Sequence, residues 1–197
     1  MGNISLENRR VLITGGTQGV GYEIARSAVE AGVSSLVICG RDAPKGEAAV
    51  EKLSFATAKV SFVPVNLANP RGAAELFSQA LKTMGSVDGL VNAAGITTRG
   101  SFLDGKLEDW EQIFAINARA PFLLMQQFIR HRLERASSGT IVNVSSMNTH
   151  CGAPELAIYS ASKGALSTLT KNEQTPIWRT RSGSTPSPWD GHRRRRK

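Results

Sequence analysis

The chain has 197 residues, of which 41% are hydrophobic and 20% are charged, a composition typical of one globular domain. No apolar run reaches the ~18 residues that a membrane-spanning helix needs, and the N-terminus lacks the apolar core of a signal peptide. The two cysteines, Cys39 and Cys151, are too few for a disulfide framework, so a cytoplasmic location is expected. The net charge of +8 lies mostly in residues 173–197, so the rest of the chain gives little reason to expect a nucleic-acid partner.

The first predicted element is a strand over 10–14. It is followed by the run Gly15-Gly-Thr-Gln-Gly-Val-Gly21 and by a predicted helix over 22–31, which ends at Gly32. Strand, glycine turn and helix in this order form the phosphate-binding unit of dinucleotide-binding folds. The glycines admit backbone N–H groups close to a pyrophosphate, and the helix N-terminus adds a partial positive charge. An ordinary glycine-rich turn is the alternative.

The second predicted strand, over 35–40, ends at the residues that would select the cofactor. An acidic residue there would bind the ribose hydroxyls of NAD, but Gly40 occupies that position. Arg41 can pair with a 2′-phosphate, which predicts NADP rather than NAD. A solvated arginine is the alternative, and Asp42, together with Gln18 in the glycine run, keeps NAD open.

Apolar strands and amphipathic helices continue to alternate along the chain. Strands are predicted over 59–65, 87–91 and 140–144, and helices over 71–84 and 107–135, the last interrupted near Ala120-Pro121. This alternation predicts an α/β fold with a doubly wound parallel sheet, right-handed crossovers and helices on both faces.

The last predicted strand leads to three residues that suggest acid–base chemistry. It ends at Ser146, and Tyr159 and Lys163 follow at a spacing that places both on one face of a helix. An ammonium beside a phenol favours the phenolate, which makes the phenol a better proton donor. Ser146 can donate a hydrogen bond to the same substrate oxygen.

Taken together, these motifs resemble the short-chain dehydrogenase/reductase family. The matching segments are Thr14-Gly-x-x-x-Gly-x-Gly21, Asn92-Ala-Ala-Gly95, Asn117 within Ile116-Asn-Ala-Arg119, Ser146, and Tyr159-x-x-x-Lys163. The resemblance implies a Rossmann-like fold and an NADP(H)-dependent enzyme, without a metal, that interconverts a ketone and a secondary alcohol.

The resemblance also implies a role for each site residue. Tyr159 is implied as the general acid/base, Ser146 as the group that polarises the carbonyl oxygen, and Lys163 as the partner of Tyr159 and of the nicotinamide ribose. Asn117 is implied to anchor a water in the proton relay. The cofactor-binding residues implied are Gly15, Thr17, Gln18, Gly19, Val20, Gly21, Arg41, Asn66, Leu67, Asn92, Ala93, Gly95, Tyr159 and Lys163.

Related enzymes often pair through the helices that here contain Asn117 and Tyr159, so a homo-oligomer is expected. The expected ligand besides the cofactor is a small carbonyl or alcohol, whose identity the motifs do not specify. At two positions the chain departs from the family pattern: Asn66 replaces the usual Asp, and Ala93 replaces the second Asn of the Asn-Asn-Ala-Gly turn.

The resemblance ends after about Asn172. Residues 1–172 are predicted to form the dinucleotide-binding catalytic domain, incomplete at its C-terminal end, and residues 173–197 a basic, disordered tail. Without the last strands of the family, the strand over 140–144 becomes a sheet edge, and weak or no activity is expected. Shifting the codons of residues 181–191 by one base can give Ile-Arg-Val-Asn-Ala-Ile-Ala-Val-Gly-Trp, which suggests a frame slip near residue 172.

Three functional hypotheses therefore stand. The chain is a working reductase, a catalytically inactive truncated relative, or a basic module that binds nucleic acid through residues 193–197.

Overall fold

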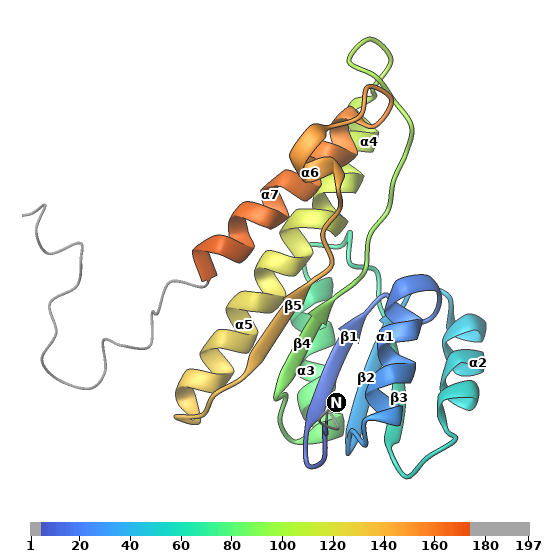
Figure 1. Ribbon diagram of the computed structural model, residues 1–197, viewed down its shortest axis with the longest axis vertical. Coiled ribbons are helices and arrows are strands. Elements are labelled where there is room, and N and C mark those ends of the chain that lie inside the picture. Colours follow the sequence, from blue (N-terminus) through green and yellow to red (C-terminus); the bar gives the residue numbers. More distant parts are fainter. Residues whose placement is uncertain (1–4, 174–197) are drawn as a thin grey trace, which may run out of the picture.

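The computed structural model describes residues 5–173, which form an α/β fold around a parallel sheet. The strands are β1 (Arg10–Thr14), β2 (Ser35–Gly40), β3 (Lys59–Pro64), β4 (Gly89–Asn92) and β5 (Thr140–Asn143). They lie in the order β3-β2-β1-β4-β5, and every neighbouring pair is parallel (Figure 1). This confirms the predicted doubly wound parallel sheet.

The helices follow the predicted alternation with the strands (Figure 1). They are α1 (Gly19–Glu30), α2 (Ala43–Leu53), α3 (Gly72–Met84), α4 (Leu107–Phe114), the π-helical turn η1 (Ala115–Arg119), α5 (Ala120–Glu134), α6 (Asn148–Cys151) and α7 (Ala157–Glu173). α1 begins before its predicted start, because the last glycines of the glycine run already belong to its first turn.

Two apolar cores form because successive side chains of a strand point to opposite faces of the sheet. Val11 and Ile13 pack with α1 and α2 on one face, whereas Leu12 and Val37 pack with α3 and α5 on the other. Strands buried on both faces explain why the sequence shows continuous apolar runs rather than alternation.

The long helical region over 107–134 contains a π-helical turn where the sequence suggested only an interruption. Pro121 has no backbone N–H to donate to the carbonyl of Asn117, and its ring would clash with that carbonyl in a regular helix. The widened turn, Ala115–Arg119, lies one turn before the proline and contains Asn117. The sequence located the irregularity near Ala120-Pro121, and the structure moves it toward the N-terminus without breaking the helix.

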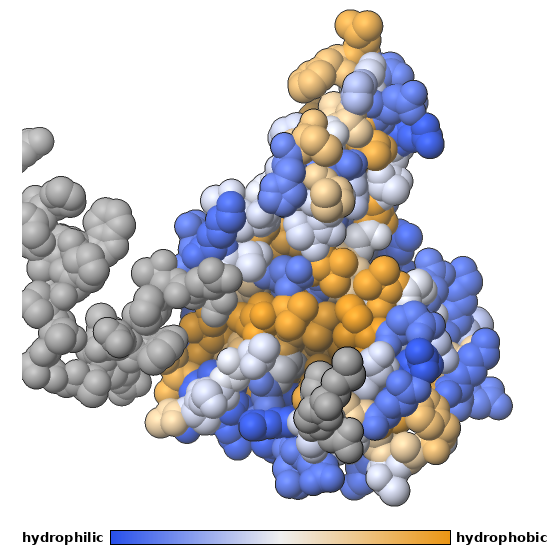
Figure 2. All heavy atoms as spheres, viewed as in Figure 1, coloured by the Kyte–Doolittle hydropathy of each residue, from blue (hydrophilic) through white to orange (hydrophobic). Residues whose placement is uncertain are grey.

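Within residues 5–173, β5 is the edge strand of the sheet, as predicted. Val142, on this strand, remains 48% exposed, so the expected helix cover on both faces does not extend over β5. Figure 2 shows a band of hydrophobic residues across the middle of the molecule, over the region where β4 and β5 lie in Figure 1. An edge strand beside exposed apolar surface is a site for aggregation or for further pairing.

The predictions for the basic tail concern residues that, from 174 onward, lie outside the described part of the chain. Among residues 5–173, no helix combines the length and apolar character needed to cross a membrane.

Candidate active site

The glycine turn after β1 has the geometry of a phosphate cradle. Gly15 and Gly19 have φ of +67° and +57°, which favour glycine, and a Cβ built at Gly21 would lie 2.3 Å from the carbonyl oxygen of Gly15. No atom of residues 5–173 lies within 4 Å of a Cβ built at Gly19, so these residues leave the approach to the helix N-terminus open. The N-cap residue Gln18 makes no side-chain cap, and the first turn of α1 contains no acidic residue. These features fit a pyrophosphate, because the free N–H groups and the helix dipole attract an anion.

At the end of β2, no acidic side chain occupies the position expected to bind the ribose hydroxyls of NAD. A Cβ built at Gly40 would lie 3.0 Å from Cγ2 of Thr17, which leaves little space for an acidic side chain there. Asp42 is engaged elsewhere, because its carboxylate accepts a hydrogen bond from the backbone N–H of Lys45 (3.0 Å) and caps α2. The side chain of Arg41 is exposed between them.

After β3, the side chains of Asn66 and Leu67 are engaged within the protein itself. The side chain of Asn66 accepts a hydrogen bond from the N–H of Ala68 (3.0 Å) and forms a local turn. Leu67 is 7% exposed and belongs to the core, so its side chain has little surface left for a ligand. The predicted contact of Leu67 with the adenine would therefore have to be made by its backbone, and it stays a prediction.

Thr14 ties the glycine turn to the Asn92–Gly95 turn that follows β4. Its hydroxyl oxygen accepts hydrogen bonds from the N–H groups of Ala93 (3.1 Å) and Ala94 (3.0 Å). Asn92 is buried, and its amide donates to the side chain of Asn143 on β5 (2.8 Å). Asn92 thus joins two strands, whereas Ala93 and Ala94 are half-buried and Gly95 is exposed.

Lys163 is the buried cation of the site. It is 4% exposed, and its Nζ donates to the carbonyl of Val144, the residue directly after β5 (2.8 Å). Burial lowers the pKa of Lys163. Among the described side chains, no carboxylate lies within ion-pair distance of it. Gly95 is its close neighbour, because a Cβ built there would lie 3.5 Å from Nζ of Lys163.

Asn117 is fully buried and, like Lys163, lies beside Gly95 in the turn after β4. A Cβ built at Gly95 would lie 3.5 Å from its Oδ1. Its Oδ1 accepts from the N–H of Ile96 (3.0 Å), and its amide donates to the carbonyl of Ile96 (2.9 Å) and to the hydroxyl of Ser162 (3.0 Å). Both amide hydrogens are therefore used, so Asn117 could hold a relay water only as an acceptor, at the second lone pair of Oδ1 or at its backbone carbonyl, to which Pro121 offers no N–H.

Ser146 and Tyr159 come from the two segments that flank this cluster. The Ser146 hydroxyl oxygen accepts from the N–H of Asn148 (3.2 Å) at the start of α6, and within residues 5–173 it donates no hydrogen bond. Its proton is thus available to a ligand. Tyr159 is half-buried on α7, one turn before Lys163. His150, on α6, is exposed.

Two residues of this hydrogen-bond network, Ser162 and Asn143, are not among the site residues that the sequence motifs predict. Ser162 accepts from Asn117 and lies inside the Tyr159–Lys163 motif, and Asn143 connects β5 to Thr170 of α7 (2.9 Å). A polar residue within the apolar run of β5 was the available signal for Asn143. For Ser162 the signal was its position four residues before the buried Leu166, which places it on the buried face of the helix.

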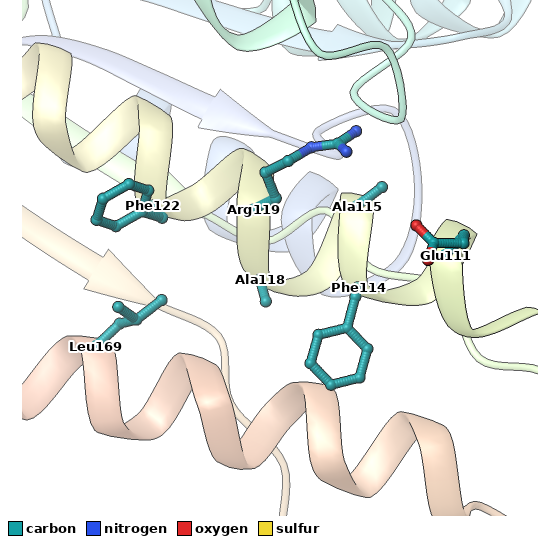
Figure 3. A pocket seen from close by; sticks show the side chains of 7 residues that line it. All are labelled: Glu111, Phe114, Ala115, Ala118, Arg119, Phe122 and Leu169. Atoms are coloured by element: carbon teal, nitrogen blue, oxygen red, sulfur yellow. The ribbon is translucent and has the colours of Figure 1, made fainter.

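A separate hollow of about 320 Å³ lies between α7 and the helical region formed by α4, η1 and α5 (Figure 3). Its lining residues are Glu111, Phe114, Ala115, Ala118, Arg119, Phe122 and Leu169. In Figure 3 the side chains of Phe114 and Ala118 point toward α7, and none of the predicted catalytic or cofactor residues takes part. The expected pairing of two copies through these helices stays a prediction.

Comparisons with known proteins agree with the arrangement of these elements. The family model for short chain dehydrogenase matches residues 9–180. The chain is 34% identical over 167 residues to 5-keto-D-gluconate 5-reductase of Escherichia coli strain K12, covering 85% of this chain and 65% of the relative. It is 32% identical over 167 residues to NADP-dependent (R)-specific alcohol dehydrogenase of Lentilactobacillus kefiri, covering 85% of this chain and 66% of the relative.

A solved structure of a short chain dehydrogenase/reductase family protein superposes with a TM-score of 0.79 at 33% identity. The superposition covers 89% of this chain and 71% of that chain. The chain spans 65% of the length of the first curated relative that it matches, so part of that relative has no counterpart in it.

Proposed function

The chain belongs to the short chain dehydrogenase family, and we propose that it is an NADP(H)-dependent oxidoreductase that interconverts a ketone and a secondary alcohol. The observation that carries this proposal is the approach of Lys163 and Asn117 to Gly95, one helical turn from Tyr159. Relatives whose names specify a keto acid or an alcohol as substrate support the same class of reaction.

In the proposed reduction, the Tyr159 phenol donates its proton to the substrate carbonyl oxygen. The Ser146 hydroxyl donates a hydrogen bond to the same oxygen and stabilises the negative charge that develops there. The nicotinamide, when bound, supplies the hydride.

Lys163 and Asn117 support the proton donor. The Lys163 ammonium favours the phenolate that remains after proton transfer, and because Lys163 is only 4% exposed, little water is present to screen this attraction. Asn117 holds the water through which Tyr159 is reprotonated, and it does so as an acceptor, because both hydrogens of its side-chain amide are already donated.

The test of the catalytic assignment is Tyr159→Phe, with Tyr22→Phe as the matched control at the only other tyrosine. We expect Tyr159→Phe to lower kcat by about 10²–10⁴-fold and to change the NADPH Kd by less than about threefold, because only the proton donor is lost. NADPH consumption would be followed with 5-keto-D-gluconate and simple ketones. Equal turnover in Tyr159→Phe and the unaltered chain would contradict the assignment.

The proposed cofactor is NADP, which Arg41 would bind through the 2′-phosphate. Arg41→Ala should weaken NADPH binding by about tenfold, or ~1.4 kcal/mol, and leave NADH binding unchanged, because only NADPH has the phosphate. Fluorescence titration with both cofactors measures this. Arg9→Ala, at an exposed arginine before β1, is the control, and an equal loss of both cofactors in Arg41→Ala would argue for NAD.

The second candidate is an inactive relative that binds the cofactor without turnover. Within residues 5–173, the exposed edge strand β5 favours it. Saturable NADPH binding together with no turnover on any carbonyl, in the unaltered chain, would establish this alternative.

A further inference from the structure

Ser162 links two parts of the site that are far apart in the sequence. Its side chain is fully buried, its hydroxyl donates to the backbone carbonyl of Tyr159 (2.7 Å), and its oxygen accepts from the amide of Asn117 (3.0 Å). Both partners of the hydroxyl therefore have fixed directions, which leaves the Ser162 side chain a single satisfied orientation.

The link continues from Asn117 to the turn after β4. Asn117 bonds both the N–H and the carbonyl of Ile96, the residue directly after Gly95. A path of four hydrogen bonds thus connects the backbone of Tyr159 with the turn that lies against Lys163. A buried path of this kind is rigid, because breaking any bond would leave a buried polar group unsatisfied.

We propose that Ser162 is a positioning residue that holds the α7 face carrying Tyr159 and Lys163 at a set distance from the Gly95–Ile96 turn. This inference rests on the proposed function. Ser162 does not touch the substrate; it acts through Asn117 and through the backbone of Tyr159. Catalysis is sensitive to such placement, since an error of about 1 Å can cost about 100-fold in rate.

The same helix offers two matched comparisons. Within residues 5–173, the buried hydroxyl of Ser160 has no hydrogen-bond partner, so its removal leaves no other described group unsatisfied. Thr170 resembles Ser162 in its bonds, because it donates to the carbonyl of Leu166 (2.7 Å) and accepts from Asn143 (2.9 Å). Thr170, however, ties α7 to β5 away from the Asn117 contact, so its loss should affect stability without affecting placement of Tyr159.

The experiment compares Ser162→Ala, Ser162→Thr, Ser160→Ala and Thr170→Ala in the full chain. We expect Ser162→Ala to lower kcat about tenfold while the KM for NADPH stays within about twofold, and Ser162→Thr, which keeps the hydroxyl, to recover most of the kcat. Ser160→Ala and Thr170→Ala should keep the kcat of the unaltered chain at a temperature where all variants are folded.

A second readout does not depend on turnover. Amide hydrogen exchange at Ile96 should become faster in Ser162→Ala, because Asn117 loses the contact that fixes it, and should not change in Ser160→Ala or Thr170→Ala. Unchanged kcat in Ser162→Ala, or an equal loss of kcat in Thr170→Ala, would overturn the proposal. If the unaltered chain shows no turnover, the proposed function fails separately, and equal Ile96 exchange in Ser162→Ala and Ser160→Ala then overturns the Ser162 link.

Discussion

The two ends of the parallel sheet both bury charged side chains, but only the amino end pairs its buried charge with opposite charges among residues 5–173. At the amino end, Asp88 precedes β4 and is 8% exposed; its carboxylate accepts from Nε of Arg10 (2.8 Å) and from Nη1 of Arg132 (2.8 Å). Burial alone would raise the pKa of Asp88, but the hydrogen bonds and charge of Arg10, followed by the charge of Arg132, hold that pKa below its ordinary value.

At the carboxyl end, Lys163 is buried as deeply, yet within residues 5–173 its ammonium donates a hydrogen bond only to the uncharged carbonyl of Val144. Burial therefore lowers the pKa of Lys163, and nothing among the described carboxylates compensates. The amino end thus pairs its charges with one another, whereas the carboxyl end keeps an unpaired cation, for which the proposed function supplies a phenolate and a bound cofactor as partners. Uncompensated buried charge is typical of functional sites.

The amino end also contains a buried histidine. Among residues 5–173, the carboxyl end has no counterpart to it. His131 accepts at Nε2 from the N–H of Val87 (3.3 Å) and lies 3.0 Å from the Ser86 hydroxyl. Burial, then the charges of Arg135 and Arg132, lower the pKa of His131. The neutral ring is the form that can accept the Val87 hydrogen bond, so the shift matches the structural role.

The largest effect is expected at Lys163. Lys163→Met should lower kcat by at least about 100-fold, because the phenolate loses its cation. Its free energy of unfolding should change by less than about 1 kcal/mol or increase, because a buried charge without an acidic partner is removed. Lys171→Met, at an exposed lysine of the same helix, is the control. If Lys163→Met lowered the free energy of unfolding as much as removal of the Asp88 charge does, the proposed difference between the two ends would be wrong.

The next effect is expected at Asp88. Asp88→Asn should lower the free energy of unfolding by about 2–3 kcal/mol, because Arg10 and Arg132 keep their positions and lose their carboxylate. Urea denaturation measures this, and Glu51→Gln, at an exposed carboxylate of α2, should have little effect. NADPH affinity should stay the same, so a variant of full stability with weakened NADPH binding would contradict the structural assignment.

The smallest effect is a pH dependence of stability from His131. Because its folded pKa lies below the ordinary value of about 6.5, its contribution is complete above that pH and decreases as the pH falls toward the folded pKa, where the unfolded chain binds the proton first. We expect the free energy of unfolding to be lower at about pH 5.5 than at about pH 7.5, by less than ~1 kcal/mol from this group.

His131→Gln should remove this part of the pH slope, and His150→Gln, at an exposed histidine, should leave it in place. Stability curves from urea denaturation at the two pH values compare the three proteins. A slope that is unchanged in His131→Gln would place the responsible group elsewhere.

Local patterns in the sequence were sufficient for the parallel sheet and for the residue types of the site. The apolar runs predicted all five strands near their observed bounds, because buried parallel strands need continuous apolar side chains. Glycines at Gly15 and Gly21 predicted the cradle, and the spacing of Tyr159 and Lys163 predicted a shared helix face, because both depend on backbone geometry over a few residues.

Only the tertiary structure could show which distant groups meet. The contacts of Asn117 with Ser162, of Asp88 with Arg132 and of Asn92 with Asn143 join residues 45, 44 and 51 positions apart, and no local periodicity encodes such pairs. The same holds for Leu67, whose side chain lies in the core because neighbouring elements pack over it. Short-range order follows from backbone sterics and apolar spacing, whereas the pairing of buried polar groups depends on how the layers pack, which requires the whole fold.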